Sequence, residues 1–253
     1  MCTKAITCEL PMKLLLINPN TSAAMTASLG DAARAVAAPT TQVLAVNPDF
    51  GPASIEGHYD DVFGAAGVAQ QVKLNPGHDA VVVACFGDPG VDAARELTTA
   101  PVLGIAEAAF HAASMLATGF SVVTTMTRTC VIAERLVQRH GFERSCRGIH
   151  GTDIPVLDLE AGGEATVARI EAAARHALAA DRSGAIVLGC AGMAALVRTL
   201  QQRLGVPVID GVAAAVKFSE GLVALGLRTS KQGDYAAPLA KPWAGWALPL
   251  APG

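Results

Sequence analysis

The sequence lacks a long apolar segment and any run of basic residues, and each absence removes a class of function. Its apolar stretches are short and interrupted by Gly, Pro and Asp, whereas a helix needs about 20 apolar residues to cross a bilayer. The formal net charge is -3 at pH 7, with no cluster of Lys or Arg to attract nucleic acid or an anionic membrane. We therefore expect no membrane and no nucleic-acid partner, and a small molecule as the ligand.

The sequence also lacks the cysteine patterns of disulfide-rich and metal-binding proteins. Six cysteines in 253 residues are few and scattered, no C-x-x-C pair occurs, and no G-x-G-x-x-G turn is present. We expect free thiols and neither a metal nor another cofactor. Residues 1–11 have no apolar core of a signal peptide, which favours a cytoplasmic protein. Four cysteines are expected to be ordinary tail or helix residues: Cys2, Cys8, Cys130 and Cys146.

The apolar runs that are present alternate with helical patterns. Leu14 to Ile17 predict a strand, followed by a polar turn and an Ala-rich helix to about Ala38. Continuous Val, Ile and Leu runs indicate strands that are buried on both faces, which predicts an α/β fold with parallel sheets flanked by helices. Further strands are expected at 42–46, 80–84 and 102–105, and helices at 60–72, 91–97 and 107–117.

The pattern restarts in the second half of the chain. A strand is expected at 120–125, a helix at 128–140, strands at 185–188 and 206–209, and the exposed face of a helix at 164–182. Asp79 to Gly87 parallels Gly184 to Gly192, which suggests an internal duplication. We expect two similar lobes around one cleft: residues 12–110 with 211–235, and residues 111–210, with tails at 1–11 and 236–253.

Cys85 and Cys190 occupy matching places in these repeats. Each ends an apolar strand and is followed two positions later by Gly and then by a helical pattern, with Asp88 as a candidate helix cap after Cys85. A helix N-terminus favours a thiolate and lowers a cysteine pKa from about 8.5. A thiolate and a thiol on opposite faces of a carbon beside a carbonyl form a two-base system that inverts configuration.

Polar residues after the first strand of each half are candidate substrate ligands. Asn18, Thr21 and Ser22 follow the first strand, and Thr124 and Thr125 close its counterpart. Their hydroxyl, amide and backbone N–H groups can stabilise negative charge on a carbonyl oxygen, although caps and turns are an equally good explanation for each. Two further features stay open: Phe86 belongs to the cleft or to the core, and the loop with Glu56 and His58 is a pocket rim or a solvated loop.

The chain resembles the hydantoin and allantoin racemase family of the Asp/Glu racemase superfamily. The motifs that carry the resemblance are Ile17 to Ser22, Ser54 to His58, Ala84 to Gly90, Val187 to Met193 and Pro207 to Asp210. It implies pseudo-twofold lobes, no metal or pyridoxal phosphate, a homo-oligomer, and Cys85 and Cys190 as the acid/base pair. It also implies a substrate pocket that includes Gly87, Ala191 and Gly192. The stretches 120–125 and 207–231 favour allantoin over other 5-substituted hydantoins.

Two alternatives remain at this point. A maleate-type isomerase would use one cysteine to add to a double bond and the other to supply a proton. A non-catalytic binding module with two α/β lobes would bind a small molecule without turnover, but it would leave the two strand-end thiols unexplained.

Overall fold

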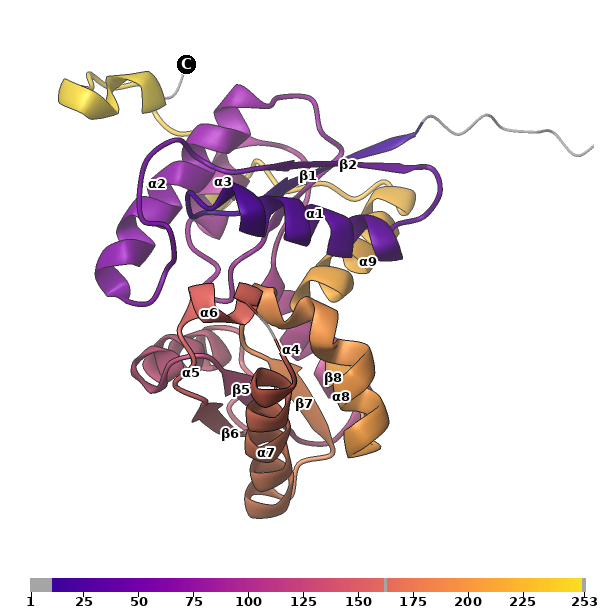
Figure 1. Ribbon diagram of the computed structural model, residues 1–253. Helices are drawn as coiled ribbons and strands as arrows, with labels where there is room; N and C mark the ends of the chain where they lie inside the picture. The colour runs from indigo at the N-terminus through magenta and orange to yellow at the C-terminus, as the bar shows by residue number, and fades with distance from the viewer. Residues whose placement is uncertain (1–10, 162, 252–253) are drawn as a thin grey trace, which may run out of the picture.

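A computed structural model describes residues 11–161 and 163–251, and it has two lobes that each contain a parallel sheet (Figure 1). The first sheet has the order β2-β1-β3-β4, and the second has the order β6-β5-β7-β8. All six strand pairs are parallel. The predicted α/β fold with two similar lobes is confirmed, and the matching strand orders agree with an internal duplication. The strands are β1 (Met12–Ile17), β2 (Thr41–Val46), β3 (Ala80–Val83), β4 (Val102–Gly104), β5 (Phe120–Thr124), β6 (Cys146–Gly151), β7 (Ala185–Leu188) and β8 (Val208–Ile209).

Helices cover both faces of each sheet, and in the described part of the chain none is long and apolar enough to cross a membrane. The α-helices are α1 (Ala23–Val36), α2 (His58–Leu74), α3 (Val91–Leu97), α4 (Ile105–Leu116), α5 (Cys130–Arg139), α6 (Val156–Ala161), α7 (Glu164–Asp181), α8 (Val197–Leu204) and α9 (Gly211–Ala224). The short 3-10 helices are η1 (Thr127–Thr129), η2 (Ala191–Leu196), η3 (Gly233–Tyr235) and η4 (Gly245–Leu250).

The central strands form because their residues are apolar and can be buried on both sides. Leu14, Leu15, Leu16 and Ile17 of β1 are fully buried, as are three of the four residues of β7. This burial explains why continuous apolar runs marked these strands in the sequence. The strand β6 differs, because its residues Cys-Arg-Gly-Ile-His-Gly form no apolar run, and the sequence pattern does not predict it. Cys146 begins this edge strand, so its expected place in a tail or helix is wrong; Cys130 begins α5, and Cys2 and Cys8 lie outside the described residues.

The end of the chain returns to the first lobe. Helix α9 packs against α1, α4 and β3, and a Cβ at Gly211 would lie 2.3 Å from the carbonyl oxygen of Ile105. Glycine at this position therefore lets α9 begin directly against the start of α4. The predicted lobe boundaries, 12–110 with 211–235 and 111–210, stay a prediction.

Asp88 joins the turn after β3 to the start of α4. Its two carboxylate oxygens accept hydrogen bonds from the backbone N–H groups of Ala106 and Glu107, both at 3.0 Å. Asp88 has a φ of 48° and Gly90 has a φ of 70°, so the chain turns sharply and Gly90 is the N-cap of α3. The expectation that Asp88 caps the helix after Cys85 is therefore wrong, because this turn directs its carboxylate to α4.

We predict that Asp88→Ala lowers the free energy of unfolding by about 1–3 kcal/mol, because two N–H groups at the start of α4 lose their acceptor. Urea unfolding followed by circular dichroism measures the change. The control is Asp31→Ala, which removes an exposed ion pair with Arg34 and should change stability by about 0.5 kcal/mol or less. Equal unfolding midpoints for Asp88→Ala and the unsubstituted protein would show that this cap contributes nothing.

Candidate active site

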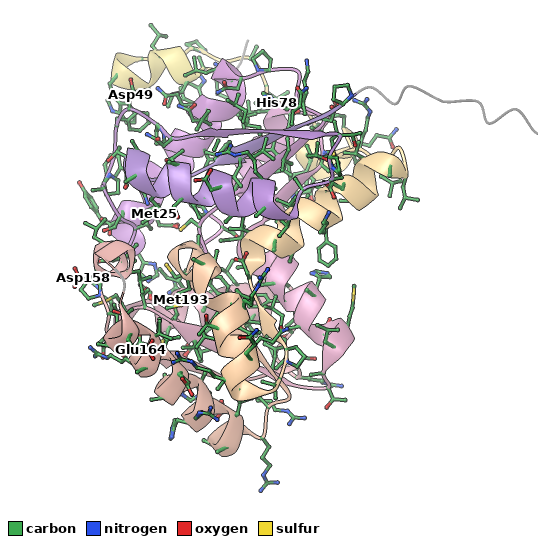
Figure 2. All side chains as sticks on the ribbon, turned by 45° about the vertical axis from the view of Figure 1, so that its right-hand side comes forward. Met25, Asp49, His78, Asp158, Glu164 and Met193 are labelled. Carbon is green, nitrogen blue, oxygen red and sulfur yellow. The ribbon has the colours of Figure 1, made fainter. Side chains whose placement is uncertain are left out.

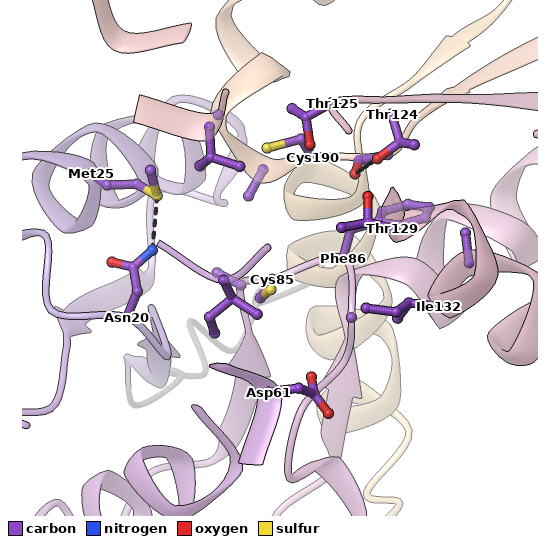
Figure 3. Close-up of a pocket in the computed structure, with 18 residues that line it drawn as sticks. Asn20, Met25, Asp61, Cys85, Phe86, Thr124, Thr125, Thr129, Ile132 and Cys190 are labelled. Carbon is purple, nitrogen blue, oxygen red and sulfur yellow. Dashed lines mark hydrogen bonds between the residues drawn. The ribbon is translucent and has the colours of Figure 1, made fainter. Parts of the chain in front are cut away.

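The two cysteines that the sequence singled out line one cavity between the lobes (Figure 3). The cavity contains about 650 Å³ of empty space, part of it open to solvent. In Figure 2, Met25 in α1 of the first lobe and Met193 in η2 of the second lie on the sides where the lobes approach each other. Met25 itself lines the cavity. Because Cys85 follows β3 and Cys190 follows β7, the cavity lies at the carboxyl ends of strands from both sheets. Parallel sheets bind ligands at these ends.

Equivalent backbone contacts position the cysteines in the two lobes. Cys85 follows β3 by two residues, and Cys190 follows β7 by two residues. The N–H of Ala84 donates to Ile17 at the end of β1, and the N–H of Gly189 donates to Val123 of β5, both at 2.8 Å. Each cysteine is therefore placed beyond the edge of its sheet by a hydrogen bond from the residue before it to the central strand.

Close packing requires the glycine that precedes Cys190. A Cβ at Gly189 would lie 2.6 Å from the Cβ of Thr124, and the Thr124 hydroxyl donates to the Gly189 carbonyl at 2.8 Å. The end of β5 thus contacts the turn that holds Cys190. Any side chain at position 189 would move the thiol relative to the cavity.

The surroundings of the thiols keep them protonated at neutral pH. Burial raises the pKa of Cys85 to about 12 and the pKa of Cys190 to about 11. Hydrogen bonds from the backbone N–H groups of Gly87 and Gly192 act in the opposite direction but are outweighed. The nearby Cys190 and Asp61 raise the pKa of Cys85 further.

The expected lowering of these pKa values is therefore wrong for this structure. The expectation relied on helix N-termini directly behind the cysteines. Cys190 instead precedes the 3-10 helix η2, and α3 begins six residues after Cys85, so loss of hydration dominates. One of the two thiols must still lose its proton before the pair can act as base and acid.

Six of the expected ligand residues lie in the cavity wall. Phe86 also belongs to the core, since its ring packs edge-to-face on Phe110 with the centroids 5.7 Å apart. Phe86 therefore contacts both the cleft and the core. Thr125 is buried and lines the cavity. The six wall residues are Phe86, Gly87, Thr124, Thr125, Ala191 and Gly192.

Asn18, Thr21 and Ser22 do not line the cavity, because their polar atoms hold the turn after β1. Asn18 Nδ2 donates to Asn20 Oδ1 at 2.8 Å. The Thr21 hydroxyl donates to the Pro52 carbonyl at 3.2 Å, and the Ser22 hydroxyl caps α1 by accepting from the Met25 N–H at 3.1 Å. The turn and cap explanation therefore accounts for all three, and their role as ligands has no support from this geometry.

Asn20, from the same polar turn, takes the expected place of Asn18. It lines the cavity, and among the described residues its Nδ2 donates only to the Met25 sulfur at 3.2 Å, an acceptor weaker than oxygen. The motif of Asn18 to Ser22 was the signal for it, but the motif alone does not tell which amide faces inward. Other elements contribute cavity residues that no sequence motif marks: Met25, Ile55, Asp61, Thr129, Ile132, Ala133 and Val156.

The loop before α2 is a rim of the cavity and connects the lobes. Glu56 Oε1 accepts a hydrogen bond from the backbone N–H of Val156, the first residue of α6, at 2.8 Å. Both Ile55 and Val156 line the cavity. Of the two explanations left open for this loop, the rim is the one that the contacts favour.

The described wall of the cavity has no positively charged side chain of the kind that binds anionic ligands. Among the described residues that line the cavity, Asp61 is the one charged side chain and there is no Lys, Arg or His. Within residues 11–161 and 163–251, no three His, Cys, Asp or Glu side chains are grouped so as to hold a metal ion. The cavity thus offers hydroxyls, amide groups and thiols around a largely neutral surface.

Comparisons with known proteins agree with this geometry. A sequence profile described as Asp/Glu/Hydantoin racemase matches residues 14–218. A hydantoin racemase from Pseudomonas sp. strain NS671 is 46% identical over 236 residues, which cover 92% of this chain and 95% of the relative. Allantoin racemase from Klebsiella pneumoniae is 53% identical with a TM-score of 0.93, covering 96% of this chain and all of that one. Allantoin racemase from Pseudomonas fluorescens is 39% identical with a TM-score of 0.90, covering 92% and 100%.

We predict that, at pH 8, iodoacetamide alkylates Cys190 about tenfold and Cys85 about thirtyfold more slowly in the folded protein than in urea. With a pKa of about 11 for Cys190 and about 12 for Cys85, the thiolate is about 100-fold and about 1000-fold rarer than in the unfolded chain, and its higher nucleophilicity restores roughly a factor of ten and of thirty. The rate should keep rising above pH 9, since the thiols lose their protons only near their raised pKa values. Mass spectrometry of the labelled peptides measures each cysteine. A rate that levels off below pH 8 would contradict the raised pKa values.

Proposed function

The chain belongs to the Asp/Glu/hydantoin racemase family, and from this membership we propose that it racemises a hydantoin-type ring, with allantoin ahead of other 5-substituted hydantoins. A racemase is an isomerase, so the reaction changes configuration and leaves composition unchanged. The observation that carries the proposal is the presence of two equivalent cysteines, one from each lobe, in the wall of a single cavity. The proposed preference for allantoin is supported by the 53% identity with the Klebsiella pneumoniae enzyme.

The reacting carbon of such a ring, C5, carries one hydrogen and lies beside a carbonyl. In the proposed mechanism the thiolate of one cysteine removes this proton, and the electron pair moves into the carbonyl to form an enolate. The thiol of the other cysteine then delivers its proton to the opposite face of C5, and the electron pair returns. The first cysteine ends as a thiol and the second as a thiolate, so the roles are exchanged for the reverse reaction.

The enolate oxygen needs hydrogen-bond donors, and the cavity offers two. Thr125 contributes a hydroxyl, and Asn20 Nδ2 donates to nothing stronger than a thioether sulfur among the described residues. A donor of this kind typically lowers the barrier by about 2.7–4 kcal/mol when it is well placed. The hydroxyl of Thr124 is less available, since it already donates to Gly189.

The charge of the wall favours a neutral ring over a dicarboxylate. Maleate would bring two negative charges next to Asp61, and no cation among the described lining residues would offset them. A hydantoin ring is neutral and exposes both N–H and carbonyl groups. The wall therefore supports ring racemisation over the maleate-type isomerase.

Three further properties belong to the same proposal. The described cysteines are all free thiols, which suits the reducing cytoplasm. A homo-oligomer would cover exposed apolar side chains such as Met115 and Leu225. If allantoin is the substrate, the enzyme acts in purine degradation.

The proposed function predicts loss of optical rotation when the purified, metal-stripped protein is incubated with one enantiomer of allantoin or of a 5-substituted hydantoin. In deuterium oxide, deuterium should enter C5 as rotation is lost, because each inversion delivers a solvent-derived proton. Polarimetry and mass spectrometry follow the two processes together. Unchanged rotation with all these rings, beyond the background rate without protein, would refute the proposed function. Activity lost to a chelator and restored by a divalent ion would refute cofactor independence.

We predict that Cys85→Ser and Cys190→Ser each abolish racemisation, because an alcohol is too weak an acid and base near neutral pH. Each variant keeps one thiol and should exchange the C5 hydrogen of one enantiomer for deuterium without inversion. The favoured enantiomer should differ between the two variants. The matched control is Cys130→Ser, since Cys130 lies outside the cavity wall, and it should racemise normally. Near-normal racemisation by either of the first two variants would show that the replaced thiol is not a catalytic acid or base.

A further inference from the structure

Asp61 in the first turns of α2 has a carboxylate oxygen with no hydrogen-bond partner among the described residues. The oxygen, Oδ1, is buried, and the side chain lines the cavity next to the cysteines. A Cβ at Gly87 would lie 3.2 Å from Oδ1, which places the oxygen beside the turn that holds Cys85. Figure 3 shows Asp61 and Thr125 on opposite sides of Cys85.

The unpartnered oxygen has a cost that local structure does not offset. A buried polar atom without a partner destabilises a fold, because it has lost its hydrogen bonds to water. The burial raises the pKa of the Asp61 carboxyl, while His58 on the same helix acts in the opposite direction. The neighbouring Asp60 already supports the loop, since its carboxylate accepts a hydrogen bond from the Glu56 N–H at 3.0 Å. Within the described residues, no hydrogen bond to the buried oxygen of Asp61 explains its position.

We propose that Asp61 binds the substrate by accepting a hydrogen bond from a ring N–H, and that it thereby selects rings that carry such a donor. This inference rests on the proposed function, because it concerns the same cavity and the same ring. The chemical class that fits is a neutral cyclic imide or urea with a nitrogen-bound hydrogen near the stereocentre.

An N–H group is the part of the ring that suits this carboxylate. An ionised carboxylate accepts hydrogen bonds and donates none. The carbonyl beside C5 gains negative charge as the proton leaves, so a carboxylate next to that oxygen would raise the barrier. The ring therefore turns its N–H toward Asp61 and its reacting carbonyl toward the donor side of the cavity, where Thr125 lies. Asp61 sets this orientation without exchanging a proton with C5.

The test compares the racemisation activity of Asp61→Leu with that of the unsubstituted enzyme. Leucine has a similar size and no hydrogen-bond acceptor. Both enzymes are assayed on a ring that has both N–H groups and on rings that lack one of them. The reference is a 5-substituted hydantoin. The first probe is the matching oxazolidine-2,4-dione, in which oxygen replaces N1–H without added volume. The second is the 3-methyl hydantoin, which lacks N3–H. For each enzyme we measure kcat/KM and take the ratio of hydantoin to probe, so that differences in the intrinsic reactivity of the rings cancel between the enzymes.

For at least one probe, the unsubstituted enzyme should show a ratio at least about tenfold higher than the ratio of Asp61→Leu. A site built to bind a polar group rejects an analogue that lacks it, and this rejection disappears with the acceptor. Equal ratios in both enzymes for both probes would overturn the inference even if Asp61→Leu is much less active, since a merely structural residue would slow all rings alike. If the unsubstituted enzyme racemises none of the rings, the proposed function fails instead, and the two failures are distinguishable.

Two further variants support the comparison. Asp61→Asn keeps the shape and one acceptor oxygen, and it should lower the ratio about fivefold because a neutral acceptor forms a weaker hydrogen bond than a charged one. It decides the question if Asp61→Leu does not fold, and an unchanged ratio would then overturn the inference. Asp60→Asn is the matched control on the same helix, retains an acceptor for the Glu56 N–H, and should leave the ratio unchanged.

Discussion

The structure depends on one constraint of parallel sheets: strands buried on both faces can place polar and reactive groups only beyond their ends. β3 and β7 are buried throughout, so the first positions free for chemistry come after their carboxyl ends. Cys85 and Cys190 occupy these positions at the same offset, and the residue before each cysteine donates a hydrogen bond to the central strand. Because the two lobes turn these edges toward each other, both thiols line the same cavity.

Enclosure between the lobes also makes both thiols harder to ionise, and this affects the proposed reaction in two ways. Burial raises the pKa of both thiols well above the ordinary value, so few molecules carry a thiolate at neutral pH. A thiolate with a raised pKa is, however, a stronger base toward a weakly acidic C–H. The second thiol stays protonated for the same reason and is ready to donate. Burial thus makes the thiolate rare but increases its basicity. It also keeps the opposite cysteine protonated.

Much of the fold and the centre of the candidate site could be predicted, because strong local patterns encode them. Continuous apolar runs predict seven of the eight strands in the described residues, whereas edge strand β6 has the sequence Cys-Arg-Gly-Ile-His-Gly and contains no such run. Six of the nine expected ligand residues line the cavity. The other three, Asn18, Thr21 and Ser22, hold the turn and cap α1. A polar residue after a strand can serve a cap or a ligand equally well, and its type does not tell which.

The sequence by itself determined the α/β repeat, the two strand-end cysteines and the family, since each depends on residue types at short spacing. Tertiary structure decided which polar groups face the cavity. Asn20 rather than Asn18 faces inward, Asp88 caps α4 across the turn, and Glu56 contacts the opposite lobe. It also decided the pKa of the thiols, because hydration is lost only when the two lobes enclose them. Asp61 acquires its unpartnered oxygen in the same way, because packing between distant segments, which no local pattern encodes, places it beside Cys85.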